Sequence, residues 1–440
     1  MGGRWFGAVR LADDAGLLAA ATAEAPPAAA RLRVIGVLGV GQVLVWGSTY
    51  YLPAVLAKPT AEATGWPLPW VIGGLSLGLL VSGLVSPKVG SLIEHRGGRP
   101  VLMASAVLSA IGLAGLAAAP GLPVFLLAWL VLGVAMGAGL YDPAFATLGR
   151  LYRQDARSAI TSLTLIAGFA STVCWPLSAL LLQHFGWRGT CLGYAVLQLV
   201  VVLPLYGVGL PREARQTAGP SRLARGPSGQ GGARSATASG RAPFATSDRR
   251  PGDWLLFLLV AVSQTLASVI PAIVSVHLLT ILQQRGVGLD AAVALGTLVG
   301  PCQVAARLID LMCGRLVHPV WEMLLASVLV VLGLGLLASG AGAVWIGLVL
   351  YGAGVGLRSI VRGTLPLALF GAAGYARRMG RLALPMLLVQ AAAPSAGALL
   401  LQHAGAGGIL AALFWVAVVT LAAGAVLIPF ARPQPQGPAG

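Results

Sequence analysis

Charged side chains are scarce in this chain. Asp, Glu, Lys and Arg make up 10% of its 440 residues, and only 13 residues are acidic. A soluble domain carries about 25% charged residues, whereas 57% of this sequence is apolar. The composition therefore excludes an ordinary soluble protein and indicates one that lies in a lipid bilayer.

Patterns that would hold a cofactor are also missing from the sequence. The four cysteines lie in apolar runs without zinc-site spacing, and we find no phosphate-binding glycine loop or nucleophile elbow. The net charge is +16, but the cations do not alternate with aromatic residues as on a nucleic-acid surface. We expect no metal, no cofactor and no nucleic-acid partner.

Long apolar runs dominate what is present. A helix needs about 20 mostly apolar residues to cross the hydrocarbon, and twelve runs qualify: 34–57, 68–87, 101–119, 122–147, 159–183, 189–210, 254–282, 291–313, 320–340, 342–366, 382–401 and 406–430. They predict an all-α membrane protein with twelve transmembrane helices in two pseudo-symmetric six-helix bundles, at 33–210 and 254–430. Residues 1–32 and 431–440 are expected to be cytosolic tails, and 211–253 a cytosolic linker rich in Arg, Gly, Pro and Ser.

Lysine and arginine are distributed unevenly around these runs. With both termini in the cytosol, 23 of the 29 cations fall on the cytosolic side, and only Lys58, Arg188 and Arg285 fall on the other. Because cytosolic loops carry an excess of Lys and Arg, this bias predicts a multi-pass protein of the inner (plasma) membrane with both termini in the cytosol.

The sequence repeats itself at about half its length. Leu-Leu-Leu-Gln-His occurs at 180–184 and again at 399–403, and three weaker matches in the same order have nearly the same offset. The pattern indicates two copies of one module of about 217 residues. Secondary transporters are commonly built from such repeats, with the substrate site between them.

A loop rich in glycine and charge follows the second apolar run, and it reads Gly90-Ser-Leu-Ile-Glu-His-Arg-Gly-Gly-Arg99. It resembles the Gly-x-x-x-Asp-x-x-Gly-Arg-Arg motif of the major facilitator superfamily, with Glu94 in place of Asp. The resemblance covers roughly 34–430 and implies a secondary transporter. In that family the loop closes the cytosolic side, so the resemblance implies a gating role for Glu94 and Arg99.

Within that superfamily, the chain looks most similar to the monocarboxylate-porter-like branch and its bacterial relatives. Three features carry this resemblance: Tyr141-Asp-Pro-Ala-Phe-Ala146, Phe185-Gly-Trp-Arg188, and an arginine and an aspartate in the eighth run. In those porters an Arg and an Asp of helix 8 serve substrate and proton. Arg307 and Asp310 stand in the reverse order here.

Few acidic residues remain as candidates for coupling protons to transport. Asp142 and Asp310 lie inside apolar runs, whereas Glu322 and the other acids outside the Glu94 loop are assigned to tails, loops or helix edges. An ionisable residue within the membrane is a functional candidate. The alternatives are a gate role for Asp310, which aligns with Glu94 in the repeat, and an ion pair of Asp142 with a cytosolic cation such as Arg150.

Two sets of side chains are candidates for binding a substrate. Gln42, Trp46, Thr49 and Tyr50 approximate one face of the first helix, and Gln264 and Ser268 lie on its repeat partner, the seventh. Arg307 and Arg358 would bind a carboxylate or phosphate if they face a central cavity. The alternatives are interhelical packing for the polar set and snorkelling for the arginines, most of all for Arg362.

The leading interpretation is a monomeric secondary transporter that moves a small organic anion by alternating access, with protons as a candidate coupling ion. Efflux of a hydrophobic metabolite or drug is the second interpretation. A polytopic membrane enzyme and a sensor that does not transport are weaker alternatives, because the acids are dispersed and the chain shows no appended output domain.

Overall fold

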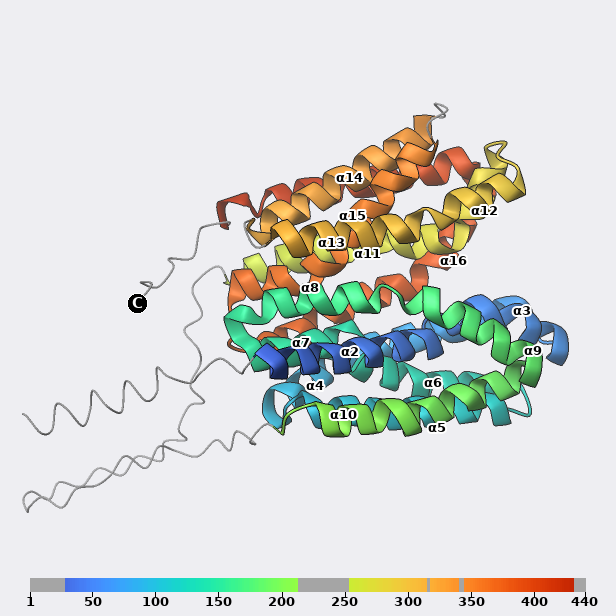
Figure 1. Cartoon of the computed structure of the whole chain (residues 1–440). Helices are drawn as coiled ribbons and strands as arrows, with labels where there is room; N and C mark the ends of the chain where they lie inside the picture. Colours follow the sequence, from blue (N-terminus) through green and yellow to red (C-terminus); the bar gives the residue numbers. More distant parts are fainter. Residues whose placement is uncertain (1–27, 213–252, 315–316, 340–343, 431–440) are drawn as a thin grey trace, which may run out of the picture.

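The computed structural model describes residues 28–212, 253–314, 317–339 and 344–430, and these residues form helices joined by short turns (Figure 1). Most of the expected tails and linker lies outside the described residues. The all-α expectation is confirmed in this part of the chain. The helices are predominantly apolar, as expected for helices that face lipid and one another.

The described part of the first half, residues 28–212, contains nine α-helices. They are α2 (Ala28–Ser48), α3 (Leu52–Thr64), α4 (Leu68–Arg96), α5 (Gly98–Ala118), α6 (Leu122–Gly139), α7 (Tyr141–Tyr152), α8 (Ala156–Ala167), α9 (Ala170–Leu197) and α10 (Leu203–Gly209), with η1 (Arg153–Asp155) and η2 (Gln198–Val202) between them. Proline occupies the first turn of α3, α4 and α6. A backbone N–H has no partner at that position, so proline starts a helix there at little cost.

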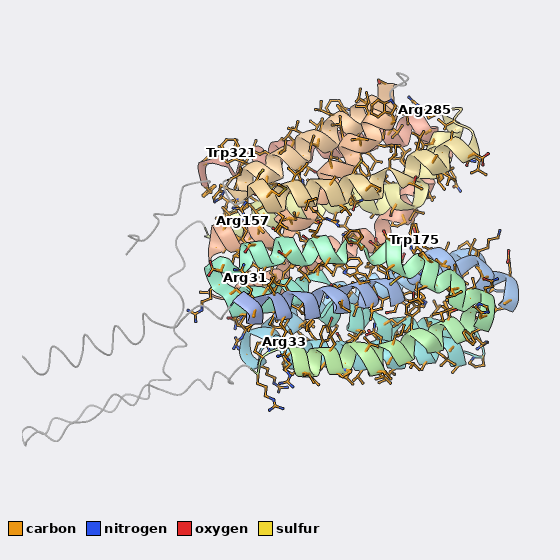
Figure 2. The ribbon with its side chains drawn as sticks, in the orientation of Figure 1. Arg31, Arg33, Arg157, Trp175, Arg285 and Trp321 are labelled. Carbon is orange, nitrogen blue, oxygen red and sulfur yellow. The ribbon has the colours of Figure 1, made fainter. Side chains whose placement is uncertain are left out.

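The described part of the second half contains α11 (Asp253–Gln284), α12 (Leu289–Thr297), α13 (Val299–Cys313), α14 (Pro319–Ser339), α15 (Val344–Phe370), α16 (Tyr375–Ala425) and η4 (Ile428–Phe430). Helices α2 and α11 begin, and α10 ends, at one end of the molecule, which we call the linker end (Figure 1). The labelled residues Arg31, Arg33 and Arg157 lie toward this end, and Arg285 lies at the opposite end (Figure 2).

Ten helical stretches among the described residues are long and apolar enough to cross a membrane. The count differs from the expected twelve because two stretches, Ala156–Gly209 and Tyr375–Phe430, have 54 and 56 residues. Each contains a glycine with positive φ that interrupts the helical backbone, Gly186 (φ 66°) and Gly405 (φ 64°). These glycines are 219 positions apart, the same offset as the sequence repeat, so the repeat extends to the backbone conformation.

Backbone contact joins the two halves of the chain near the linker end. A Cβ atom on Gly90 of α4 would lie 2.4 Å from the carbonyl oxygen of Ala376 in α16, and a Cβ on Gly380 would meet the carbonyl oxygen of Ser86. Small residues permit such close helix crossings in membranes. A buried core around Phe145, Tyr375 and Met386 continues this contact across the halves.

Candidate functional site

A cavity of about 150 Å³ lies between the two halves. The first half contributes Trp46 and Tyr141 to its wall. The second half contributes residues of α11, α14, α15 and α16, which are Gln264, Ala267, Ser268, Ile270, Pro271, Ser327, Val330, Val355, Arg358, Ser359, Arg362, Met386, Gln390, Ala417 and Thr420. The wall is mostly apolar, with a few polar groups and two guanidinium groups, as is typical of a site for a small organic molecule.

The two cavity arginines lie one helical turn apart on α15, so they share one face. Arg358 donates from Nη1 to Ser327 Oγ at 2.8 Å and from Nη2 to the Ser263 carbonyl oxygen at 3.1 Å. Both acceptors are neutral. Its Nε atom is buried and has no hydrogen-bond partner among the described residues. Arg358 therefore places a positive charge at the cavity without a carboxylate to balance it in the described structure.

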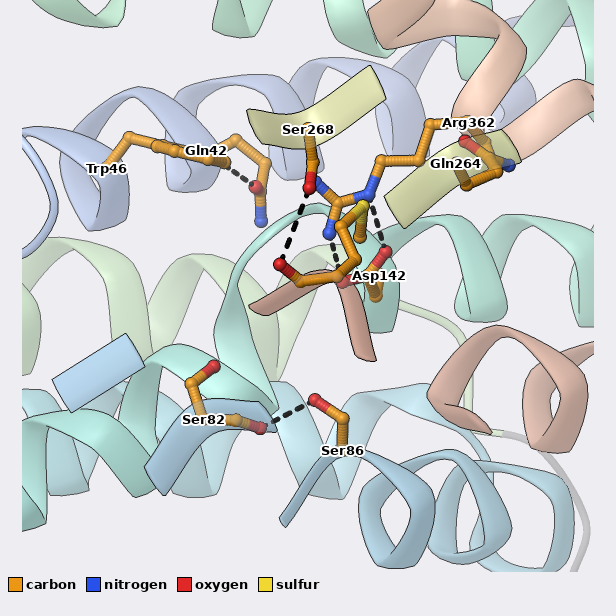
Figure 3. A network of polar contacts seen from close by, with 9 residues as sticks. Gln42, Trp46, Ser82, Ser86, Asp142, Gln264, Ser268 and Arg362 are labelled. Carbon is orange, nitrogen blue, oxygen red and sulfur yellow. Dashed lines mark hydrogen bonds and ion pairs between the residues drawn. The ribbon is translucent and has the colours of Figure 1, made fainter. Parts of the chain in front are cut away.

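Arg362, in contrast, is paired with an acid from the first half. Its Nε donates to Asp142 Oδ1 at 2.9 Å, and its Nη2 donates to Asp142 Oδ2 (Figure 3). The side chains are only 16% and 9% exposed. This bidentate ion pair corrects two expectations, because Asp142 pairs with Arg362 rather than Arg150, and Arg362 faces the cavity rather than snorkelling away from it.

Only some residues of the polar face expected on the first helix line the cavity. Trp46 lines the cavity, and its Nε1 donates to Gln42 Oε1 at 3.0 Å. Gln42 is fully buried and donates to the carbonyl oxygen of Gly139 at 2.6 Å, so it fixes the indole from behind. The Thr49 hydroxyl donates to the backbone carbonyl oxygen of Val45. Tyr50 lines a narrow extension of the cavity. Gln42 and Thr49 are absent from the cavity wall.

The two candidates on α11 both line the cavity. Gln264 donates to the carbonyl oxygen of Arg362 at 3.3 Å, and the Ser268 hydroxyl lies 3.5 Å from the carbonyl oxygen of Met386 in α16. Pro271, which aligns with Pro53 in the repeat, also lines it. The seventh helix of the prediction therefore contributes to this wall as expected, and its polar groups have acceptors within the second half.

Arg307 lies outside the cavity wall. It is 5% exposed, and it donates to Ser359 Oγ at 3.0 Å and, across the halves, to the Thr164 carbonyl oxygen at 3.4 Å. A direct contact of Arg307 with substrate stays a prediction, and its observed position is that of a bridge between α13 and α8.

A second ionic bridge between the halves lies nearer the linker end. Arg157, at the start of α8, pairs with Glu322, in the first turn of α14. Asp310 is 8% exposed, and its Oδ2 lies 3.4 Å from the Thr161 hydroxyl across the halves. Glu322 lies at a helix edge, as expected, but it is only 5% exposed, which the sequence did not predict. Its position three residues after Pro319 gave no signal of burial, because burial depends on the facing half.

The remaining gate candidates have partners within the first half. Arg99 donates to the carbonyl oxygen of Gly207, and Arg150 donates to the backbone carbonyl oxygen of Glu94. The segment expected as a loop is mostly helical, with Glu94 in the last turns of α4 and Arg99 in the first turn of α5, and both contacts hold this α4–α5 junction against neighbouring helices at the linker end. Arg315, the repeat partner of Arg99, lies outside the described residues.

Comparison with known proteins supplies the family. The model of the Major Facilitator Superfamily matches residues 38–357, which is more than half of the chain. The chain belongs to the Major Facilitator Superfamily. Members of this superfamily are multi-pass membrane transporters and not enzymes, and the resemblance of the Gly90–Arg99 segment to the superfamily is confirmed.

Several relatives of this superfamily member are similar over part of its length. An uncharacterised 38 kDa protein of Thermoproteus tenax is 34% identical over 164 residues, covering 37% of this chain and 43% of that protein. Monocarboxylate transporter 11 of Mus musculus is 34% identical over 120 residues, covering 27% of this chain and 26% of the transporter. The chain thus spans less than half the length of these two curated relatives.

Solved structures match over nearly the whole chain. The human organic anion transporter MFSD10 aligns with a TM-score of 0.69 at 18% identity, covering 91% of this chain and 100% of that one. The proton:xylose symporter XylE aligns with a TM-score of 0.68 at 12% identity, covering 92% and 96%. At these identities the likeness establishes the fold.

Proposed function

We propose that this superfamily member is a secondary transporter of a small organic anion. The observation that carries the proposal is Arg358, a cavity-lining cation whose hydrogen-bond acceptors are neutral and whose buried Nε has no partner in the described structure. A charge at membrane depth costs several kcal/mol unless it is balanced. A substrate carboxylate would balance it through a charge-assisted, bidentate contact.

The shape of the cavity wall limits the rest of the substrate. Val330, Val355, Met386 and Ala417 form an apolar surface around the arginines. Such a surface favours a single carboxylate attached to an apolar group over a polyhydroxylated molecule, whose hydroxyls would lose hydrogen bonds on entry. Gln390 and Thr420 are among the polar residues of the wall that could contact the rest of the substrate.

The proposed architecture is twelve spans in two six-helix bundles, at 33–210 and 254–430, joined by a cytosolic linker at 211–253. Gly186 and Gly405 divide the two longest stretches into two spans each, which accounts for the twelve. The linker end is then the cytosolic end, as the cation bias predicts, and the protein is a monomer of the inner membrane.

Transport would proceed by rocking of the two halves around the cavity. The bridge between α8 and α14 lies toward the linker end, as does the crossing of α4 and α16, and the ion pair between α7 and α15 lies beside the cavity. In this arrangement the cytosolic side is closed and the substrate enters from the other side. Asp142, Asp310 and Glu322 are the buried acids available to couple protons.

Ligand stabilisation of the purified protein tests the proposed substrate class. Lactate, pyruvate, benzoate and phenylacetate are compared with their uncharged amides in a thermal unfolding assay in detergent. A ligand at a concentration of 100 times its Kd stabilises the folded state by about 2.7 kcal/mol. We expect at least one carboxylate to raise the Tm while its amide does not.

Two variants make this test specific to the cavity. Arg358→Gln should abolish the carboxylate shift, whereas Arg285→Gln, which removes an exposed cation at the far end, should retain it. Equal shifts from carboxylates and amides, or an unchanged shift in Arg358→Gln, would refute the proposal. Stabilisation by hydrophobic cations instead would favour efflux of drugs or metabolites.

A further inference from the structure

Arg362 is shared between the cavity and the ion pair that joins the two halves. It lines the main cavity beside Arg358, and it also lines a narrow extension together with Asp142, Trp46 and Tyr50. Both its Nε and its Nη2 donate to Asp142. One guanidinium fork binds one carboxylate bidentately, so a second carboxylate can use the same fork only by displacing the first.

An anion held by Arg358 would lie next to this fork. The two arginines are four residues apart on α15, and their side chains reach the same cavity. The extension that contains Asp142 has a volume of only about 10 Å³, which leaves no room for a carboxylate group beside the one already present. An anion that binds the Nε–Nη2 edge of Arg362 therefore requires movement of Asp142, whereas an anion at Nη1 does not.

The first half offers a hydrogen-bond donor to Asp142 after such a movement. Ser82 of α4 lines the same extension, and its hydroxyl is buried without a partner among the described residues. Figure 3 shows Ser82 on α4 and Asp142 on α7, and the backbone carbonyl of Ser82 accepts from the Ser86 hydroxyl. A hydroxyl can donate to a carboxylate, so Asp142 would keep a partner within its own half.

We propose that the substrate carboxylate competes with Asp142 for Arg362, so that binding of the anion breaks the ion pair between α7 and α15. This inference rests on the proposed anion transport. The exchange links occupation of the cavity to separation of the halves, because the Nε–Nη2 edge of Arg362 binds either Asp142 of α7 or the substrate carboxylate. A ligand changes a conformational equilibrium only through such a difference in its contacts between states.

Binding measurements on two acid variants test the exchange. Asp142→Asn removes the competing charge while keeping the size of the side chain, and Glu322→Gln breaks the other bridge between the halves without touching the cavity. Affinities for lactate, pyruvate, benzoate and phenylacetate are measured on the purified full-length protein. Competition predicts that Asp142→Asn binds at least about fivefold more tightly, the lower range of measured couplings between sites, whereas Glu322→Gln does not.

The outcomes separate this exchange from the anion proposal. An unchanged or weaker affinity in Asp142→Asn, or equal tightening in Glu322→Gln, would overturn the exchange. If Arg358→Gln abolishes binding while Asp142→Asn leaves the affinity unchanged, anion binding stands and the exchange is wrong. If no carboxylate in the panel binds the natural sequence, the anion proposal fails and the exchange fails with it.

A second measurement does not require the Asp142 variant to fold. Spin labels on cysteines introduced at His95 and Arg377, both exposed at the linker end, report the distance between the halves. The exchange predicts that the bound carboxylate lengthens this distance in protein with Asp142 intact, and that the amide does not. A distance that stays constant at saturating carboxylate would contradict it.

Discussion

The crossing of α4 and α16 can be opened by a single methyl group. In Gly90→Ala the new Cβ would lie 2.4 Å from the Ala376 carbonyl oxygen, whereas ordinary van der Waals contact begins at 3.4 Å. The helices must therefore separate by about 1 Å at this point. Because the obstacle is backbone, no side-chain rotation relieves it. Overpacking of this kind costs about 1–3 kcal/mol.

We expect that cost to fall on one conformation of the transporter. The contact exists only while the linker end is closed, so the substitution should shift the equilibrium toward a linker-end-open state by about 5- to 150-fold. The assay is the distance distribution between spin labels at His95 and Arg377, on a background without the four native cysteines. Gly90→Ala should add or enlarge a longer-distance component.

Gly73→Ala is the matched control on the same helix, because a Cβ at Gly73 would meet nothing within 4 Å. Its distance distribution should coincide with that of the unsubstituted protein. If Gly90→Ala gives the same distribution and the same thermal stability as Gly73→Ala, the reasoning about a closed crossing is refuted.

Three further predictions concern the bridges and the cavity wall. In Glu322→Ala, Arg157 loses its carboxylate partner at a site where the Arg157 side chain is 24% exposed and the Glu322 side chain 6% exposed. The free energy of unfolding in detergent should fall by about 3–5 kcal/mol. An unchanged Tm would contradict this. Trp46→Phe removes the donor to buried Gln42 and should lower the free energy of unfolding by about 1–3 kcal/mol; an unchanged Tm would contradict this. Burial and nearby Arg157 lower the pKa of His318 below its usual 6.5. The neutral imidazole should therefore contribute fully to the free energy of unfolding above pH 6.5, and this contribution should be lost as the pH falls below 6.5. The variant His318→Asn should show a smaller decline in Tm over the same pH range.

The sequence predicted the membrane class and family because those depend on composition and local pattern. The apolar runs, the cation bias and the Gly90–Arg99 loop each required only neighbouring residues. The repeat was also visible, and Gly186 and Gly405 share one backbone conformation at the repeat offset. Ten helical stretches were found in the described part of the chain instead of twelve spans, because at each of these two glycines the chain bends while helix continues directly on both sides. Each pair of spans therefore forms one long stretch.

The site was harder to predict because its partners come from opposite halves. Asp142 and Arg362 are 220 residues apart, and nothing local indicates that they meet. Glu322 lies in the first turn of α14, and nothing near it in the sequence indicates that Arg157 of α8 pairs with it. Gln42 had the right helical face but points away from the cavity wall and supports Trp46 instead. Periodicity predicts which residues share a face, but it does not predict which face meets the other half.

Transport in proteoliposomes tests the central claim most directly. The purified protein is reconstituted, loaded with an unlabelled carboxylate that stabilises it, and assayed for exchange with the radiolabelled compound. We predict saturable exchange that Arg285→Gln retains and that Arg358→Gln abolishes at equal reconstitution. Equal exchange in Arg358→Gln, or exchange of the corresponding amide at the same rate, would contradict the account of an anion site at this cavity.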